Sequence, residues 1–279
     1  MSVARRQRQV AEKESVAEDK PNEIRFSKRL AIPRRAQQPP VPQFVLKLFS
    51  SPAPETVRVG KHLLECVHHG PPNLYLIRNF ISETECEYLE EQVNNSKKKF
   101  KRSYTNGAPD DQVVSEERTS TFIHLPKSKD TKTRSIERKA AELVGMPVDH
   151  VEPLQIVYYT DGQKFDLHHD AGMVFAMDSR QRPVPIIQLM PPVRYFTIFV
   201  YLNTLPEGIG HTEFPEIGLS VKPERRSALL WSNMDLTGLL NFDTAVDRPR
   251  ATTVPDPLVV HKACPVPPGH HKYGMNIWI

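Results

Sequence analysis

The sequence predicts a mainly β fold of the α+β class, with the strands arranged as a sandwich or a barrel. The chain of 279 residues is long enough for one large domain or two small ones. Its 26 prolines against 12 glycines favour many fixed turns and few helices. From about residue 150 onward the apolar residues form short runs typical of strands, at 154–159, 196–203, 219–222, 228–231, 258–261 and 273–278.

The composition and the distribution of charge define one domain and a tail. With 39% hydrophobic and 25% charged residues, the chain is not collagen-like, disulfide-dense or fully disordered. Residues 1–52 carry 11 Lys and Arg against 5 Asp and Glu, whereas the remainder carries 26 against 28. We therefore expect a disordered basic tail over 1–43 and one domain over 44–279. The tail is expected to be a solvated arm; contacts with nucleic acid, an anionic membrane or an acidic partner are the alternatives.

The sequence predicts a cytoplasmic or nuclear protein without a membrane span. No stretch approaches about 18 consecutive apolar residues. The N-terminus lacks the apolar core of a secretory signal, and the acidic residues from Glu12 onward argue against a transit peptide. Cys66, Cys86 and Cys264 form an odd, sparse set without CxxC spacing, which argues against a disulfide framework or a structural zinc site.

The first part of the domain is expected to hold the first strands and two supporting helices. Short apolar runs separated by Gly and Pro predict strands at 44–46, 57–59 and 74–77. Ser82 and Glu85 have the spacing of a capping box and predict the start of a helix. A second helix is predicted over 133–145, because its apolar residues share one face and Gly145 stands where a helix ends. The helices within 80–145 are expected to support the strands of 150–279.

The segment His168-His169-Asp170 is the first indication of chemistry. In an extended segment, residues two apart point to the same face, so His168 and Asp170 can bind one metal ion while His169 points away. A second imidazole would complete a set of two histidines and one carboxylate, which leaves open positions on iron(II). The candidates for it are His211, His261, His270 and His271. His261 ends an apolar run and is followed by Lys272, whose ammonium can hold the far carboxylate of a dicarboxylate ligand.

The residues around this segment resemble a known enzyme family. Residues 152–170 read EPLQIVYYTDGQKFDLHHD and resemble the pattern E-P-x-Q-x-x-x-Y-x-x-G-Q-x-[YF]-x-x-H-x-D of the prolyl 4-hydroxylases, which are iron(II)/2-oxoglutarate dioxygenases. Further matches are R-T-S at 118–120, R-x-x-T at 194–197, Y-L-N at 201–203, T-x-F-P at 212–215, V-K-P at 221–223 and H-x-x-C-P-V at 261–266. The resemblance covers about residues 77–279, and many ordered matches over that length are far more specific than one motif.

The resemblance implies a fold, a metal site and a reaction. The fold would be a double-stranded β-helix, or jelly-roll, with helices on one face. His168, Asp170 and His261 would bind Fe(2+). The enzyme would use 2-oxoglutarate and O2, with ascorbate as reductant, and would hydroxylate a peptidyl proline in a peptide or protein partner while releasing succinate and CO2. His211 lies in a loop that the family uses structurally, so it is not expected to be a ligand.

The resemblance also assigns residues to the co-substrate. Lys272 would pair with the C5 carboxylate of 2-oxoglutarate, and Thr197 would add a hydroxyl to the same carboxylate. Tyr159 would hydrogen-bond the co-substrate from the neighbouring strand. Trp278 would line the mouth of the pocket, with an ordinary core position as the alternative. Tyr201 and Phe214 are expected in the barrel core.

Two departures from the family pattern affect these expectations. Lys272 stands eleven residues after His261, where the family usually has ten. A bulge in the turn can absorb the extra residue; otherwise His271 takes the place of the lysine. Cys264 matches a cysteine that forms a disulfide in secreted family members, but no cysteine occupies the partner region near 215–225. Cys264 is therefore expected to be a free thiol.

Three other functions are compatible with the residues. The first is a related dioxygenase that acts on another side chain, a free amino acid or a small metabolite. The second is a jelly-roll binding module without turnover, against which the intact HxD, distal histidine and lysine argue. The third is a zinc hydrolase with the same ligands, in which Lys272 and Thr197 would have no task.

Overall fold

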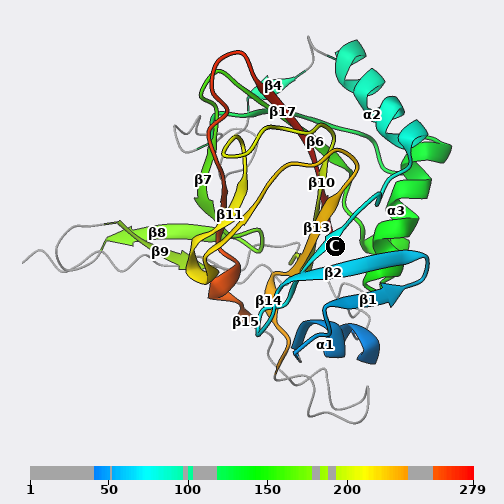
Figure 1. Cartoon of the computed structure of the whole chain (residues 1–279), viewed down its shortest axis with the longest axis vertical. Helices are drawn as coiled ribbons and strands as arrows, with labels where there is room; N and C mark the ends of the chain where they lie inside the picture. The colour runs from blue at the N-terminus through cyan, green and yellow to red at the C-terminus, as the bar shows by residue number, and fades with distance from the viewer. Residues whose placement is uncertain are drawn as a thin grey trace, which may run out of the picture. The chain divides into compact units, whose positions relative to one another are not determined.

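The computed structural model of the protein describes residues 41–50, 52–96, 100–102, 118–177, 183–187, 193–237 and 254–279. Within them, two antiparallel sheets face each other (Figure 1). The larger has nine strands, in the order β1 (Thr56–Val59), β2 (His62–His68), β3 (Leu74–Ile77), β13 (Ala228–Ser232), β10 (Phe196–Tyr201), β17 (His271–Trp278), β6 (Gln155–Thr160), β5 (Thr121–His124) and β4 (Lys101–Arg102). The smaller has four, in the order β12 (Leu219–Val221), β11 (Thr212–Phe214), β16 (His261–Ala263) and β7 (Phe165–His168). The predicted jelly-roll is confirmed.

Two hairpins and three helices complete the described fold. β8 (Met173–Met177) pairs with β9 (Pro183–Ile187), and β14 (Met234–Asp235) pairs with β15 (Val254–Pro255). The helices are α1 (Gln43–Ser50), α2 (Glu83–Ser96) and α3 (Thr131–Leu143). None of the helices among the described residues is long and apolar enough to cross a bilayer. The predicted tail, up to residue 40, lies outside the described residues.

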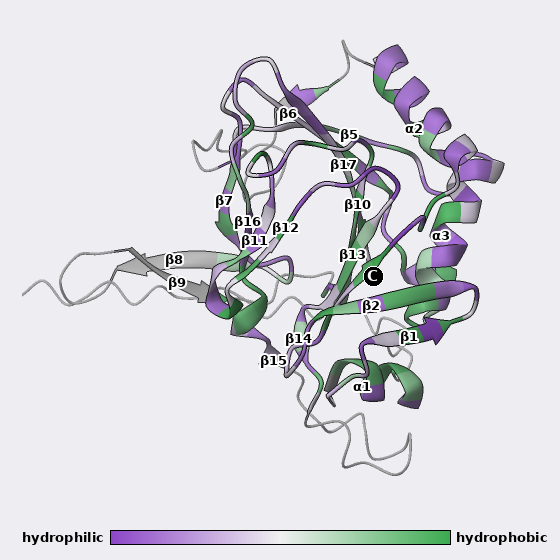
Figure 2. Cartoon of the chain, viewed as in Figure 1, coloured by the Kyte–Doolittle hydropathy of each residue, from purple (hydrophilic) through white to green (hydrophobic). Residues whose placement is uncertain are grey.

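The larger sheet separates two hydrophobic cores, because successive side chains of a strand point to opposite faces. On one face, Ile198 and Ile277 pack with the buried residues of the helices. On the other face, Phe199 and Tyr159 pack with Phe214 of the smaller sheet. The central strands β10 and β13 are buried along their whole length and are accordingly hydrophobic (Figure 2). The second of the two cores surrounds the candidate site.

The two predicted helices form where their capping residues stand. The Glu85 amide donates to Ser82 Oγ at 3.1 Å, and the Ser82 amide donates to Glu85 Oε2 at 2.7 Å, so the predicted capping box is present. α3 begins after Asp130, whose carboxylate accepts from the Thr133 amide at 2.9 Å. It ends before Gly145, which takes a φ of +59°.

Two predicted strands are wrong. The run 44–46 lies in α1, because Val45, Leu46, Leu48 and Phe49 are buried together at helical spacing. The run 258–261 is mostly a 3₁₀ turn, Pro257–Val259, and only His261 begins a strand. The ring of Pro257 fixes its φ at a value that suits the first residue of a helical turn. Asp256 Oδ1 accepts a hydrogen bond from the Leu258 amide at 3.0 Å. In both runs the apolar residues after the first are buried in a helical turn, whereas Phe44 and Leu258 are exposed.

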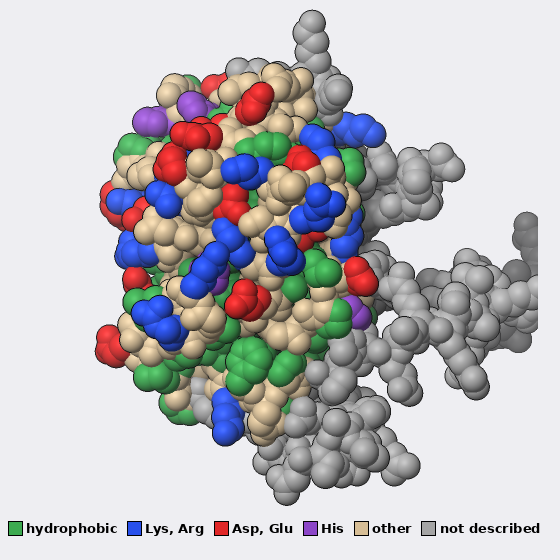
Figure 3. Space-filling model, turned by 90° about the vertical axis from the view of Figure 1, so that its right-hand side faces the viewer, with side chains coloured by type: hydrophobic (Ala, Val, Ile, Leu, Met, Phe, Trp, Pro, Cys, Tyr) green, Lys and Arg blue, Asp and Glu red, His purple; other side chains and the backbone are tan. Residues whose placement is uncertain are grey.

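The face that carries α2 and α3 has mixed charge. Figure 3 shows Lys and Arg side chains interspersed with Asp and Glu on this side of the molecule. Arg225, for example, pairs with Glu83 and Glu90, and Arg78 pairs with Glu65. Exposed pairs of this kind contribute little to stability.

The three cysteines are free thiols, as predicted for Cys264. We expect thiol counting on the denatured protein to find three reactive groups, and the intact mass to match the fully reduced chain. Under native conditions Cys264 should react slowly, because burial, with Glu213 nearby, raises the pKa of its thiol to about 11. A bridge from Cys264 to Cys66 or Cys86 would contradict this structure. A cytoplasmic or nuclear location stays a prediction.

Candidate active site

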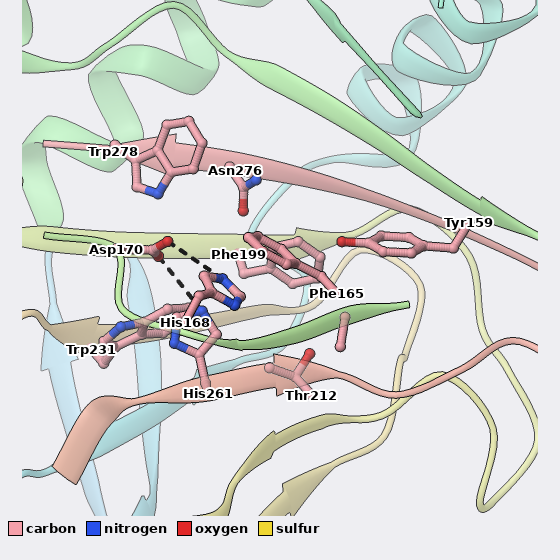
Figure 4. Close-up of a pocket in the computed structure, with 11 residues that line it drawn as sticks. Tyr159, Phe165, His168, Asp170, Phe199, Thr212, Trp231, His261, Asn276 and Trp278 are labelled. Carbon is pink, nitrogen blue, oxygen red and sulfur yellow. Dashed lines mark ion pairs between the residues drawn. The ribbon is translucent and has the colours of Figure 1, made fainter. Parts of the chain in front are cut away.

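Two histidines and one aspartate meet at the centre of the jelly-roll. β7 and β16 pair so that His168 stands directly opposite His261, and Asp170 follows two residues after His168. The Nε2 atoms of His168 and His261 each lie 3.7 Å from an oxygen of the Asp170 carboxylate (Figure 4). Each residue offers one ligand atom, and these three atoms lie within 4.8 Å of one another, close enough to hold a metal ion. These residues form the only such cluster of three among the described residues.

The tautomer of each histidine is set by its backbone partner. His168 Nδ1 lies 2.9 Å from the Asp166 carbonyl, and His261 Nδ1 lies 3.0 Å from the Val259 carbonyl. Because a carbonyl only accepts, each Nδ1 carries the proton. In the neutral ring each Nε2 then carries the lone pair, on the side of the ring that faces the Asp170 carboxylate. Outer hydrogen bonds of this kind orient the histidine ligands of metal sites.

The charges of the cluster suit a divalent cation. Burial acts to raise the pKa of Asp170, but the two imidazoles in their protonated form, Arg194 and the Thr197 hydroxyl outweigh it and hold the pKa well below its usual range. Burial is also the main reason that the pKa of His168 lies well below its ordinary value. At neutral pH the cluster thus offers a carboxylate and neutral imidazole nitrogen, the protonation states that a metal requires.

Aromatic rings enclose the cluster. Phe165 stacks on His168 with ring centroids 3.5 Å apart, and Phe214 stacks on His261 at 5.3 Å. Trp231 meets His261 edge-on at 4.9 Å. A cavity opens beside the cluster, lined by residues of both sheets. The predicted core residue Phe214 is fully buried and at the same time supports the imidazole of His261.

Lys272 places a buried ammonium among aromatic rings of the larger sheet. It stands opposite Tyr159 in the β17–β6 ladder and is fully buried. Its Nζ lies 5.3 Å from the ring centroid of Phe199 and 5.6 Å from those of Tyr159 and Tyr201, and it has no hydrogen-bond partner. Burial lowers its pKa to about 7. A buried, unpartnered ammonium is costly and indicates that an anion completes this site.

The extra residue before Lys272 lies in the turn that leads into β17. The His270 amide donates to the Pro267 carbonyl at 3.2 Å, and Gly269 has a φ of +84°. This is the geometry of a turn with proline second and glycine third. From His271 onward β17 pairs with β6 without a register shift. His271 is consequently exposed on the outer face, and the structure places Lys272, rather than His271, inside.

The sequence of this chain is similar to those of known enzymes. No family model matches the chain. Probable prolyl 4-hydroxylase 3 of Arabidopsis thaliana is 30% identical over 229 residues, which cover 75% of this chain and 69% of the relative. The chain belongs to the prolyl 4-hydroxylase family. Probable prolyl 4-hydroxylase 6 of the same plant is 29% identical over 228 residues, with the same coverage.

Solved structures of prolyl hydroxylases align with most of this family member. The viral collagen prolyl hydroxylase of Paramecium bursaria Chlorella virus-1, in complex with 2-oxoglutarate, is 22% identical with a TM-score of 0.48. The alignment covers 74% of this chain and 94% of the viral one. A prolyl hydroxylase of Trichoplax adhaerens, bound to a peptide fragment of hypoxia-inducible factor, is 13% identical with a TM-score of 0.47, covering 74% and 82%.

The role that the resemblance gave to Thr197 is wrong for this family member. Thr197 pairs with Trp278 at one end of β17, whereas Lys272 stands near the other end. Its hydroxyl donates to Asp170 Oδ2 at 2.8 Å and accepts from the Asn233 amide at 2.9 Å. With both partners in place, Thr197 orients the carboxylate of the cluster and does not reach the anion site of Lys272.

A different threonine lines the cavity. Thr212 lies on β11, and its Oγ1 accepts a hydrogen bond from the Tyr201 hydroxyl at 2.9 Å. Tyr201, expected in the core, is fully buried and also faces Lys272. The T-x-F-P match at 212–215 was the signal in the sequence that could have identified Thr212. The predicted residue Tyr159 lines the cavity and directs its hydroxyl into it (Figure 4).

Trp278 lies at the cavity wall, in the region that the sequence predicted. The guanidinium of Arg194 stacks 3.6 Å from the centre of its ring, and Arg194 is itself held by Glu152 at 2.7 and 2.9 Å. The indole Nε1 of Trp278 is buried without a hydrogen-bond partner. Its ring plane is therefore fixed by protein contacts, while its donor remains available to a bound molecule.

Two other histidines near the site, His169 and His211, have structural partners. His169 points away from the cluster, as predicted; its Nε2 lies 3.0 Å from the Asp256 carbonyl, and its Nδ1 accepts from the Ala171 amide. Burial lowers its pKa to about 4. His211 accepts from the Gly208 amide at 3.1 Å and lies 2.9 Å from the Ser220 hydroxyl. Neither is a ligand of the cluster.

Proposed function

We propose that this protein is an iron(II)- and 2-oxoglutarate-dependent dioxygenase that hydroxylates a peptidyl proline. Two observations carry the proposal: a His-Asp-His cluster that lines a cavity, and a buried ammonium without a hydrogen-bond partner that lies against Tyr159 and Phe199 of the cavity wall. His168, Asp170 and His261 would hold the iron, and the two nitrogen and one oxygen donors fit that metal. When bound, iron with 2-oxoglutarate and O2 supplies oxidative decarboxylation to succinate and CO2, coupled to hydroxylation.

Lys272 fits the far carboxylate of 2-oxoglutarate. Its ammonium is fully buried and lies 5.6 Å from the ring centroid of Tyr159, which lines the cavity together with Thr212. A carboxylate there would accept a charge-assisted hydrogen bond from Nζ and would relieve the cost of the buried charge. The aromatic rings around Nζ exclude water, which strengthens that interaction. Lys272, Tyr159 and Thr212 are thus the residues that would orient the co-substrate.

The proline substrate is proposed from the family. The Arabidopsis relatives are named as prolyl 4-hydroxylases, and the cavity beside the metal cluster, which Trp278 helps to line, would receive the side chain of the substrate. Ascorbate is proposed as the reductant that keeps the iron in its ferrous state. A peptide or protein is the proposed partner.

The experiment that tests this function is succinate release from 2-oxoglutarate with iron(II) and ascorbate. We expect low release without peptide, and stimulation by at least one member of a panel of proline-containing peptides, with the peptide gaining 16 Da (the mass of one oxygen atom). Stimulation only by free amino acids or small metabolites would indicate that the protein is a related dioxygenase with a small-molecule substrate. No succinate under any condition, with iron bound, would favour the non-catalytic binding module.

Binding of 2-oxoglutarate is expected to weaken as the pH rises above 7. Lys272 has a pKa of about 7 in the ligand-free protein, so above that pH binding requires uptake of a proton. The apparent Kd should then rise up to about tenfold per pH unit, since the linkage involves one proton. Calorimetry in two buffers of different ionisation heat would detect the proton uptake. In Lys272→Arg the side chain stays charged, and Kd should not change over this range; a flat wild-type profile would contradict the assignment.

A further inference from the structure

A row of polar side chains leads from the cavity to the surface. Asn276, Gln155 and His124 stand directly opposite one another on the neighbouring strands β17, β6 and β5. Asn276 lines the cavity, Gln155 is buried, and His124 is exposed. Neither the reaction nor the metal cluster uses this row, although it is built into the inner face of the larger sheet.

Arg118 fixes the orientation of both amides in the row. Its Nη2 lies 3.2 Å from Gln155 Oε1, and a guanidinium only donates, so the atom that faces it must be the amide oxygen. The same oxygen lies 3.0 Å from an amide atom of Asn276, which must then be the donor Nδ2. The carbonyl oxygen Oδ1 of Asn276 is left facing the cavity, as Figure 4 shows.

The Gln155 amide fixes the protonation state and the tautomer of His124 at the other end of the row. Because Gln155 presents its oxygen to Arg118 and Asn276, it presents its Nε2 donor to His124 Nε2, 2.9 Å away. That imidazole nitrogen must accept, so the ring is neutral and carries its proton on Nδ1. Partial burial lowers the pKa of His124; Glu152 opposes this, and Arg118, Arg194 and Lys101 add to it. Neutral His124 thus keeps the row in one orientation.

The acceptor that faces the cavity has a natural partner in a peptide substrate. A prolyl residue has no main-chain N–H, so the proline itself offers no donor to Asn276. The residue that follows the proline offers one, unless it is also a proline. An oriented acceptor beside the reacting centre therefore distinguishes Pro-Xaa from Pro-Pro sequences, because a polar group left unpaired on binding lowers affinity.

We propose that Asn276 accepts a hydrogen bond from the main-chain N–H that follows the target proline, and that Arg118, Gln155 and His124 are positioning residues for it. This inference rests on the proposed function and adds a sequence preference to it. The enzyme should favour proline followed by a residue with a free N–H, and it should disfavour proline followed by proline.

The test is a cycle that combines one change in the peptide with one in the enzyme. A peptide that supports turnover is compared with its analogue in which the N–H after the proline is N-methylated. For the wild-type enzyme we expect KM, and the peptide Kd measured anaerobically with iron and 2-oxoglutarate, to rise roughly tenfold. For Asn276→Ala the two peptides should bind alike, because the acceptor is missing. Equal losses in both enzymes would overturn the proposal.

A second measurement separates positioning from a merely structural role. With iron saturating, KM for the peptide should rise as the pH falls through the pKa of His124, because a protonated Nε2 would face the Gln155 donor. His124→Gln supplies an acceptor that does not titrate, so its KM for the peptide should stay low over the same pH range. The control is His69→Gln, which alters an exposed histidine after β2 and should follow the wild type. A His124→Gln profile identical to the wild-type profile would exclude His124 from the row's function.

These outcomes are distinct from failure of the proposed function. If the wild-type enzyme releases no succinate with any peptide, the dioxygenase assignment fails. If turnover occurs but N-methylation costs the same with and without Asn276, only the present inference fails.

Discussion

Replacing His168, Asp170 or His261 by alanine is expected to abolish iron binding and turnover while the fold is retained. Among the described residues no further His, Cys, Asp or Glu joins this cluster, so a lost ligand has no substitute. The three side chains come from β7, the residues after it, and β16, and their removal leaves the aromatic walls in place. Iron content and succinate yield would be measured on each purified variant, with circular dichroism to confirm folding.

His169→Ala is the matched control for these three variants. It removes an imidazole from the same segment, but one that binds the Asp256 carbonyl and the Ala171 amide instead of the cluster. We expect iron content close to that of the wild type, together with a lower Tm, because two buried polar groups lose their partner. Full activity in any of the three ligand variants would remove that residue from the proposed site, and loss of iron in His169→Ala would show that the segment itself had moved.

Lys272→Ala is expected to raise the requirement for 2-oxoglutarate strongly while iron binding is preserved. A hydrogen bond from a buried ammonium to a carboxylate contributes about 1.5–3 kcal/mol. Its loss corresponds to a roughly 10- to 150-fold weaker affinity, since about 1.4 kcal/mol is tenfold. The variant should also be at least as stable as the wild type without ligand, because it no longer buries an unpartnered charge.

The control for Lys272 is its neighbour. His271 is exposed, and its ring packs against Tyr273 on the outer face of the sheet, so His271→Ala should leave the affinity for 2-oxoglutarate unchanged. The apparent Kd of both variants would be measured with iron and peptide saturating. A large loss in His271→Ala with none in Lys272→Ala would mean that β17 is shifted by one residue. No loss in either would count against 2-oxoglutarate as the co-substrate.

The sequence by itself predicted the three residues of the metal cluster and most of the strands. His168 and Asp170 share a face because the side chains of an extended chain alternate, and that alternation depends only on their spacing. The strands at 154–159, 196–203 and 273–278 were predictable from apolar runs, because a hydrophobic core covers each face of the larger sheet at these strands. The capping box at Ser82 and Glu85 was predictable because its hydrogen bonds are local.

The tertiary structure decided which groups face each other. Whether Lys272 or His271 points inward depends on how the turn at Gly269 absorbs one residue, and a shift of one residue exchanges the two faces of a strand. The hydroxyl of Thr197 binds Asp170 because folding brings the segment after β7 next to β10, and nothing near Thr197 in the sequence indicates this. The orientation of the Asn276 amide depends on Arg118, 158 positions earlier in the chain. Spacing along the chain fixes local geometry, whereas contacts between distant segments are fixed only when the sheets pair and close.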